Sequence, residues 1–144
     1  FLDEILNYVR ADMLAYVNRA IVGADSFTEV EQRGFLAFFD YLAASPAFIR
    51  VETEAAVWAR DSYIRHFEDL ADHYLVSMRR SKAAGGLAAY EHHELPLLAY
   101  LMMGARHYIS TRYVLPQHAS GRLPAYVADA YLDLVGRGLE AAGA

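Results

Sequence analysis

Three side chains that could bind a metal ion lie close together in the sequence, at His66, Asp69 and His73. Spacings of three and four residues place them on one face of a helix, and imidazole and carboxylate groups are common metal ligands. The same stretch also contains Asp61 and Arg65, which are spaced for ion pairs with each other and with Asp69 along a helix surface. We therefore favour a solvated helix face over a metal site, and we expect no bound metal.

A second histidine motif, EHHE, covers residues 91–94. The adjacent residues His92 and His93 would point in different directions on a helix and would not easily share one ion. A carboxylate-bridged di-iron bundle would need Glu-x-x-His motifs on two helices, and the sequence lacks this pair. We therefore expect a loop or a first helical turn at this motif.

Other enzymatic chemistry has no support in the sequence. The chain contains no cysteine, which excludes thiol nucleophiles, disulfides and zinc–thiolate sites. It also lacks a Gly-x-Ser-x-Gly motif and a phosphate-binding loop. The sequence GRGLEAAG near the C-terminus has the wrong spacing for a dinucleotide-binding motif and no strand before it. We expect that the protein is not an enzyme and uses no cofactor.

Aromatic residues with polar tips are concentrated near residues 58–67 and recur around residues 100–107. Such a mixture suits a site for an apolar or aromatic small molecule. Ordinary core packing accounts for the same residue types, and His107 could simply be a hydrogen-bonded histidine at the edge of a bundle. The residues that we expect to line a ligand site are Phe39, Trp58, Tyr63, His66, Phe67, Tyr100, Met103 and His107.

The elements that would position these residues are all helices. Hydrophobic periodicity predicts six helices and no strand. Ser26 with Glu29, and Thr28 with Glu31, have the spacing of capping boxes at the start of the second helix. Gly85 follows the fourth helix as a stop signal. The predicted helices cover approximately residues 1–22, 26–44, 46–59, 61–84, 93–115 and 123–141, and we expect an all-α, six-helix orthogonal bundle.

The last two predicted helices have unusually wide apolar surfaces. The segment 95–105 offers almost no polar face, and the helix over 123–141 carries a broad apolar stripe. A helix at the surface of a monomer normally has a polar face, and large exposed apolar patches mark interfaces. We expect these helices to form a four-helix interface in a homodimer; the alternative is a central helix buried within one chain. The expected interface residues are Leu98, Leu101, Met102, Ala105, Ile109, Tyr126, Val127, Ala130, Tyr131 and Leu134.

Length, charge and hydropathy narrow the class of protein further. The 144 residues suit one domain, and a net charge of −5 argues against nucleic-acid binding by this segment alone. The longest apolar run, residues 95–105, is much shorter than the roughly 20 residues of a membrane span. We expect a cytoplasmic protein that does not enter a membrane.

The order of these segments resembles the C-terminal half of TetR-family transcriptional regulators. The opening FLDEILNYVRADMLAYV is similar to the long helix that follows their DNA-binding domain. The run YLAASPAFIRVETEAAVWARDSYIRHFEDL resembles the next segments of that family, and AAGGLAAYEHHELPLLAYLMMGARHYISTRYVL resembles the turn and first dimerisation helix. The run LPAYVADAYLDLVGRGL is similar to the closing helix. The resemblance covers residues 1–144 and implies an effector-binding and dimerisation domain.

The family's helix-turn-helix domain, of roughly 50 residues, would precede Phe1. The resemblance implies a homodimer that binds operator DNA through that missing domain and usually represses transcription. A small apolar effector would favour a subunit geometry with the wrong spacing for DNA, so operator affinity would fall. Two alternatives stay open: a helical metal protein or enzyme that uses His66, Asp69 and His73, and a dimerisation module without a ligand.

Overall fold

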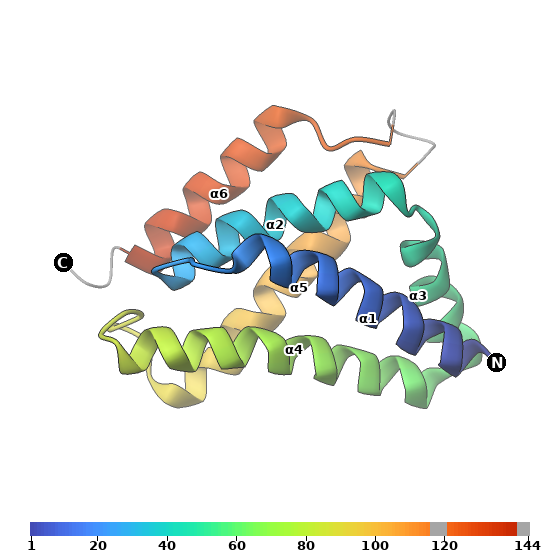
Figure 1. The fold of residues 1–144 in the computed structure, drawn as a ribbon, viewed down its shortest axis with the longest axis horizontal. Coiled ribbons are helices and arrows are strands. Elements are labelled where there is room, and N and C mark those ends of the chain that lie inside the picture. The colour runs from blue at the N-terminus through green and yellow to red at the C-terminus, as the bar shows by residue number, and fades with distance from the viewer. Residues whose placement is uncertain (116–120, 141–144) are drawn as a thin grey trace.

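The computed structural model describes residues 1–115 and 121–140, and within these ranges the chain is helical without strands (Figure 1). The predicted all-α fold with six helices is therefore confirmed for this part of the chain. The predicted end of the last helix, near residue 141, lies outside the described residues. The helices are α1 (Leu2–Ile21), α2 (Phe27–Ala44), α3 (Ala47–Trp58), α4 (Arg60–Ala83), α5 (Leu95–Tyr113) and α6 (Ala125–Glu140), with a 3-10 turn, η1 (His92–Glu94), before α5.

The start of α2 follows one of the two predicted caps. The Ser26 hydroxyl accepts a hydrogen bond from the Glu29 backbone N–H at 3.1 Å, as expected for a helix N-cap. The second predicted capping box is wrong, because Glu31 is only 1% exposed and pairs with Arg106 inside the protein. A carboxylate in the first turns of α2 is therefore part of the interior.

The helices pack around two connected apolar clusters. In Figure 1, α1 lies between α2 and α4, α5 crosses behind them, and α6 runs beside α2. One cluster is centred on Phe35, whose ring stacks on Tyr131 of α6 with centroids 4.3 Å apart. The other joins the first turn of α2 to α4 and α5 through Phe27, Met78 and Leu95. Long-range aromatic packing thus fixes how α2, α5 and α6 are placed.

The bundle changes direction between α2 and α3, which are bent by 91°. Within the described residues, no single helix has the length and apolar character to cross a membrane, although this bent pair together has both. The apolar side chains of α2 supply half of the buried residues in the first core cluster.

Gly34 offers a test of the packing between α1 and α2. It lies inside α2, and a Cβ there would meet Val17, Ile21 and Arg106 at 3.6–3.7 Å, which is ordinary van der Waals contact. Gly34→Ala should therefore raise the free energy of unfolding by about 0.5–1 kcal/mol, because glycine loses more backbone entropy on folding. Urea denaturation measures this, with Gly136→Ala in α6 as the control. A loss of stability at Gly34 alone would show that α1 lies too close to α2 for a methyl group.

Candidate functional site

A cavity of about 110 Å³ lies among the first five helices. One wall is α1, which contributes Met13, Leu14, Val17 and Ile21 together with one polar residue, Asn18. Most of the remaining surface is also apolar and comes from α2 to α5. Further apolar and aromatic lining residues are Phe27, Val30, Phe38, Phe48, Ile49, Phe67, Leu70 and Met103. An apolar cavity with few polar groups is the usual form of a small-molecule site.

Three polar residues of the lining lie together: Glu31 of α2, Tyr74 of α4 and Arg106 of α5. The other polar lining residues are Asn18, Glu52, His73, Ser77 and His107. Arg106 Nη2 donates to Glu31 Oε1 at 2.7 Å, and the Tyr131 hydroxyl donates to the same oxygen at 3.3 Å. The Arg106 guanidinium also lies over the Tyr74 ring, 5.1 Å from its centroid. We call Glu31, Tyr74 and Arg106 the polar cluster; it joins three helices at the cavity wall.

Each member of the polar cluster has one buried polar atom without a hydrogen-bond partner in the described part of the chain. These atoms are Glu31 Oε2, the Tyr74 hydroxyl and Arg106 Nε. Leaving such an atom unpaired costs about 1–3 kcal/mol, so native proteins rarely keep several together. This concentration of unpaired atoms marks the cluster as a candidate site.

The ionisation of the polar cluster follows from its burial. Burial raises the pKa of Tyr74 well above its usual value, so its hydroxyl remains neutral and can donate or accept a hydrogen bond. Burial would lower the pKa of the Arg106 guanidinium, but the charge of Glu31 outweighs this effect and raises it. Arg106 therefore remains a cation paired with Glu31.

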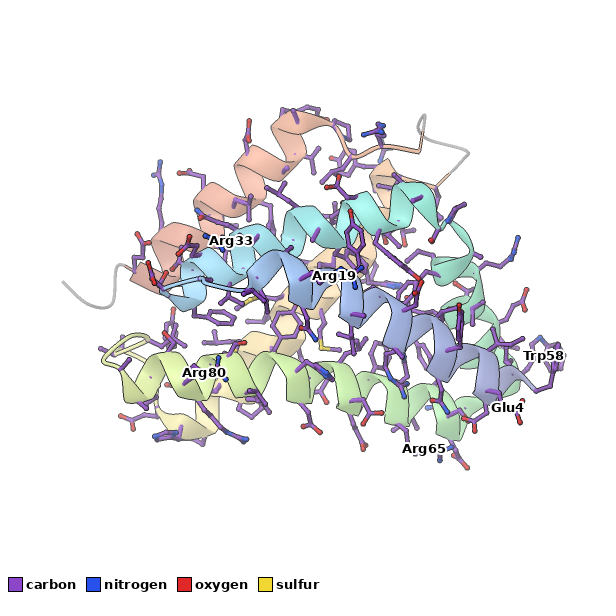
Figure 2. The ribbon with its side chains drawn as sticks, in the orientation of Figure 1. Glu4, Arg19, Arg33, Trp58, Arg65 and Arg80 are labelled. Atoms are coloured by element: carbon purple, nitrogen blue, oxygen red, sulfur yellow. The ribbon has the colours of Figure 1, made fainter. Side chains whose placement is uncertain are left out.

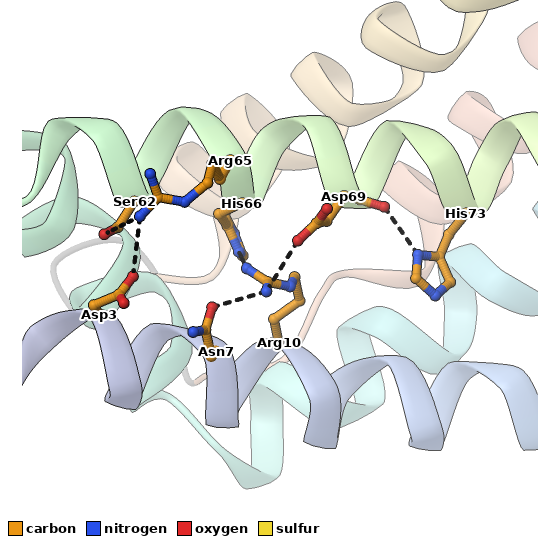
Figure 3. Close-up of polar contacts among 8 residues, drawn as sticks. All are labelled: Asp3, Asn7, Arg10, Ser62, Arg65, His66, Asp69 and His73. Carbon is orange, nitrogen blue, oxygen red and sulfur yellow. Dashed lines mark hydrogen bonds and ion pairs between the residues drawn. The ribbon is translucent and has the colours of Figure 1, made fainter.

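A second polar network connects the cavity wall to α1. Glu52 of α3 lines the cavity, and its Oε2 lies 2.5 Å from Nε2 of the fully buried His66. Arg10 Nη1 lies 3.2 Å from His66 Nδ1 (Figure 3). Because arginine can only donate, Nδ1 accepts and Nε2 carries the proton that is donated to Glu52. His66 thus bridges α3 and α1.

Further contacts tie α1 to α4. Arg10 pairs with Asp69 at 3.1 Å, and Arg65 pairs with Asp3 at 3.6 Å (Figure 3). Arg65, Asp69 and His73 are exposed, as expected for a solvated face. The predicted ion pairs inside α4 are wrong, because Arg65 and Asp69 pair with residues of α1, and His66 is buried. His73 instead contacts the Asp69 backbone carbonyl at 2.9 Å. Among the described residues, no three histidine or acidic side chains gather where they could hold a metal ion.

The cavity includes only part of the set predicted for ligand binding. Phe67, Met103 and His107 line it, while His66 lies behind the wall against Glu52. Phe39 packs in the core against Phe35 and Phe38.

The other three predicted ligand residues lie outside this lining. Tyr63 packs on Phe67 with ring centroids 4.4 Å apart. Trp58 is 81% exposed at the periphery (Figure 2), and Tyr100 is exposed on α5. Trp58 ends α3 and Tyr100 lies on the outer face of α5, so neither can point inward.

Sequence position alone could have identified two cavity residues that were not predicted, Glu31 and Arg106. Glu31 follows Phe27 by four residues and precedes Phe35 by four, which places it on the apolar face of α2. Arg106 directly follows the long apolar run of α5. A charged residue on a buried helix face requires a partner.

The outer surface of α5 and α6 keeps an apolar stripe. Leu97, Leu101 and Tyr108 are exposed on one face of α5, with spacings of four and seven residues. Tyr126, Ala130 and Leu134 are exposed at spacings of four on α6. Tyr113 and Tyr126 bring the two helices together, with ring centroids 6.4 Å apart. We call these six exposed residues the outer stripe.

Some predicted interface residues belong to the core instead. Met102, Val127 and Tyr131 are buried, because Met102 faces the second core cluster and Tyr131 packs on Phe35 of α2. Leu98, Ala105 and Ile109 are half-buried against the same core. Of the predicted set, Leu101, Tyr126, Ala130 and Leu134 are on the outside, and Leu97 and Tyr108, which were not in that set, are exposed on α5 as well.

No family model matches the chain, and no curated protein matches it. The cavity, the polar cluster and the outer stripe are therefore the grounds for assigning a function.

Tyr74→Phe tests whether the polar cluster lowers the stability of the unliganded protein. The substitution removes an unpaired buried hydroxyl, so the free energy of unfolding should rise by about 1 kcal/mol. Tyr41→Phe is the control, because the Tyr41 hydroxyl donates to Asp12 at 2.8 Å and its removal should cost about 1 kcal/mol. Chemical denaturation of the two variants should give changes of opposite sign. Equal losses would mean that the Tyr74 hydroxyl is well hydrogen-bonded.

Proposed function

We propose that this chain is the effector-binding and dimerisation domain of a transcriptional regulator that resembles the TetR family. The observation that carries the proposal is the cavity, in which an apolar lining surrounds buried polar atoms that lack partners in the described residues. An apolar pocket with a few convergent polar groups is the usual form of a ligand site. The effector would be a small, mainly apolar molecule.

The position of α1 links ligand binding to the proposed change in affinity for operator DNA. Five cavity-lining residues come from α1, so a ligand that fills the cavity presses on this helix. The contacts of Arg10 with His66 and Asp69 hold α1 against α4. A ligand that binds better when α1 is displaced shifts the population toward that geometry. In the TetR-like arrangement a DNA-binding domain precedes α1, and its operator affinity would fall by the same coupling free energy.

The outer stripe supports the dimer part of the proposal. Its six members are exposed apolar or small residues on α5 and α6, whose Tyr113 and Tyr126 rings have centroids 6.4 Å apart. Two helices from each subunit would form a four-helix interface. Such a homodimer would place two DNA-binding domains on a near-palindromic operator, and the regulator would act in the cytoplasm as a repressor.

A thermal-shift screen of single-ring apolar compounds tests the ligand part. A compound present at a hundred times its Kd stabilises the native state by about 2.7 kcal/mol. Val30→Phe, which places a larger side chain at the cavity wall, should abolish the shift, and Val76→Phe on the exposed side of α4 should not. If no compound stabilises the protein, or if Val30→Phe leaves the shift unchanged, a dimerisation module without a ligand becomes the better account.

A further inference from the structure

The unpaired atoms of the polar cluster specify the polar group that the ligand must carry. This inference rests on the proposed function, in which the cavity binds a small molecule. Glu31 Oε2 can only accept a hydrogen bond while ionised, and Arg106 Nε can only donate one. The Tyr74 hydroxyl can do either. These atoms have almost no accessible surface, so a ligand reaches them when neighbouring side chains move aside. A group that both donates and accepts then satisfies the cluster, whereas a purely apolar molecule leaves all three atoms unpaired.

The charges of the polar cluster favour a neutral group at that part of the wall. Glu31 and Arg106 form an ion pair at 2.7 Å, so the polar cluster has no net charge. An anion there would be repelled by Glu31 and would leave its free oxygen unpaired. An ammonium ion would be repelled by Arg106 and would leave its Nε unpaired. Either ion would also lose its hydration in a buried site, which is costly without an opposite partner.

The cavity volume limits the size of the ligand. An engineered apolar cavity of about 150 Å³ is large enough to bind benzene. The cavity of about 110 Å³ is somewhat smaller, so a single ring with one short substituent is the upper limit of size. The aromatic rings of Phe27, Phe38 and Phe67 in the lining suit such a ring.

We propose that the cavity binds a neutral single-ring molecule that carries one hydroxyl or carboxamide group, and that this group bonds to Glu31, Tyr74 and Arg106. The ring lies against the apolar wall that includes α1. The polar cluster determines which ligand binds, and the contact of the ring with α1 couples binding to the position of that helix.

Five compounds of similar size test the proposal by calorimetric titration: benzyl alcohol, benzamide, ethylbenzene, benzoate and benzylammonium. We expect benzyl alcohol and benzamide to bind about tenfold more tightly than ethylbenzene, since each new hydrogen bond to an unpaired buried group strengthens binding by up to that factor. Benzoate and benzylammonium should bind more weakly than either neutral polar compound. Tighter binding of either ion would overturn the proposal.

Tyr74→Phe separates the role of the polar cluster from that of the apolar lining. In this variant the preference for benzyl alcohol over ethylbenzene should fall severalfold, while the affinity for ethylbenzene stays the same. Tyr41→Phe is the control, because its hydroxyl already donates to Asp12 and Tyr41 is not among the cavity-lining residues. An unchanged preference in Tyr74→Phe would contradict the assigned hydrogen bonds.

The outcomes distinguish this inference from the proposed function. Ethylbenzene binding that Val30→Phe abolishes, with no preference for the polar compounds, would overturn the polar-group assignment and leave a ligand-binding domain. Absence of binding by all five compounds would count against both, provided that the variants remain folded by circular dichroism.

Discussion

Arg106→Met should lower the free energy of unfolding by about 3–5 kcal/mol, because it leaves the Glu31 carboxylate buried without its cation. Glu31 is 1% exposed, and the Arg106 side chain is 12% exposed. Removal of the guanidinium also removes its contacts with the rings of Phe35, Phe38 and Tyr74. Urea denaturation of the purified variant measures the loss. It is among the largest expected from a single polar substitution in this chain.

The double variant Glu31→Leu with Arg106→Met is the matched control. Both charged groups are replaced by apolar side chains, so no uncompensated charge remains buried, and much of the lost stability should return. This variant should also lose the preference for neutral polar ligands. A double variant that is no more stable than Arg106→Met would show that the packing of the guanidinium, and not the ion pair, is what matters.

Leu101→Arg should convert the expected homodimer to a monomer without unfolding it. Leu101 is 60% exposed within one chain, so an arginine there can remain in water when the partner is absent. In a two-fold interface each substitution occurs twice, and the dimer Kd should rise on the order of a hundredfold. Sedimentation velocity across a concentration series measures this change. Leu101 is preferable to Ala105, because Ala105 is half-buried against the core and an arginine there would also disturb the fold.

Val57→Arg is the control for the dimer experiment. Val57 is 67% exposed on α3, outside α5 and α6, so its replacement should leave the Kd of the dimer unchanged. A Leu101→Arg protein that dimerises as tightly as the parent would place the interface elsewhere.

The unpaired atoms of the polar cluster lower stability, and under the proposed function they do so in exchange for ligand binding. A core made only of apolar groups would fill the same space at lower cost, yet Glu31, Tyr74 and Arg106 are held together by three helices. Violations of the rule that buried polar groups are paired are expected at functional sites. Tyr74→Phe tests this with two measurements. The variant should have a higher free energy of unfolding, and its preference for benzyl alcohol over ethylbenzene should fall.

The helices could be predicted from the sequence because their signals are local. The Ser26 cap and the repeats of apolar residues involve neighbours within a few positions, and they placed the helix ends close to where they are. The side chains that face the cavity depend on partners far along the chain. Glu31 meets Arg106, 75 residues later, and its spacing from Thr28 matched a capping box equally well. Local pattern alone could not choose between these two roles.

The environment of α4 shows the same limit. His66, Asp69 and their charged neighbours have the composition of a solvated surface, and the position of α1 buries His66 and supplies Arg10 as a partner for His66 and Asp69. Trp58 shows the reverse case, because a large aromatic residue at the end of α3 is exposed. Periodicity assigns residues to helix faces, but the packing of distant helices decides which faces are covered.

The most direct test of the central claim is a methionine-methyl NMR titration with benzyl alcohol. The chain has four methionines. Met13 and Met103 line the cavity, whereas Met78 and Met102 are buried in the second core cluster and are not among its lining residues. We expect the signals of Met13 and Met103 to shift together and to saturate, with much smaller changes at Met78 and Met102. Saturating shifts confined to Met78 and Met102, or no shift at any of the four at millimolar ligand, would contradict the claim that this cavity is a ligand site.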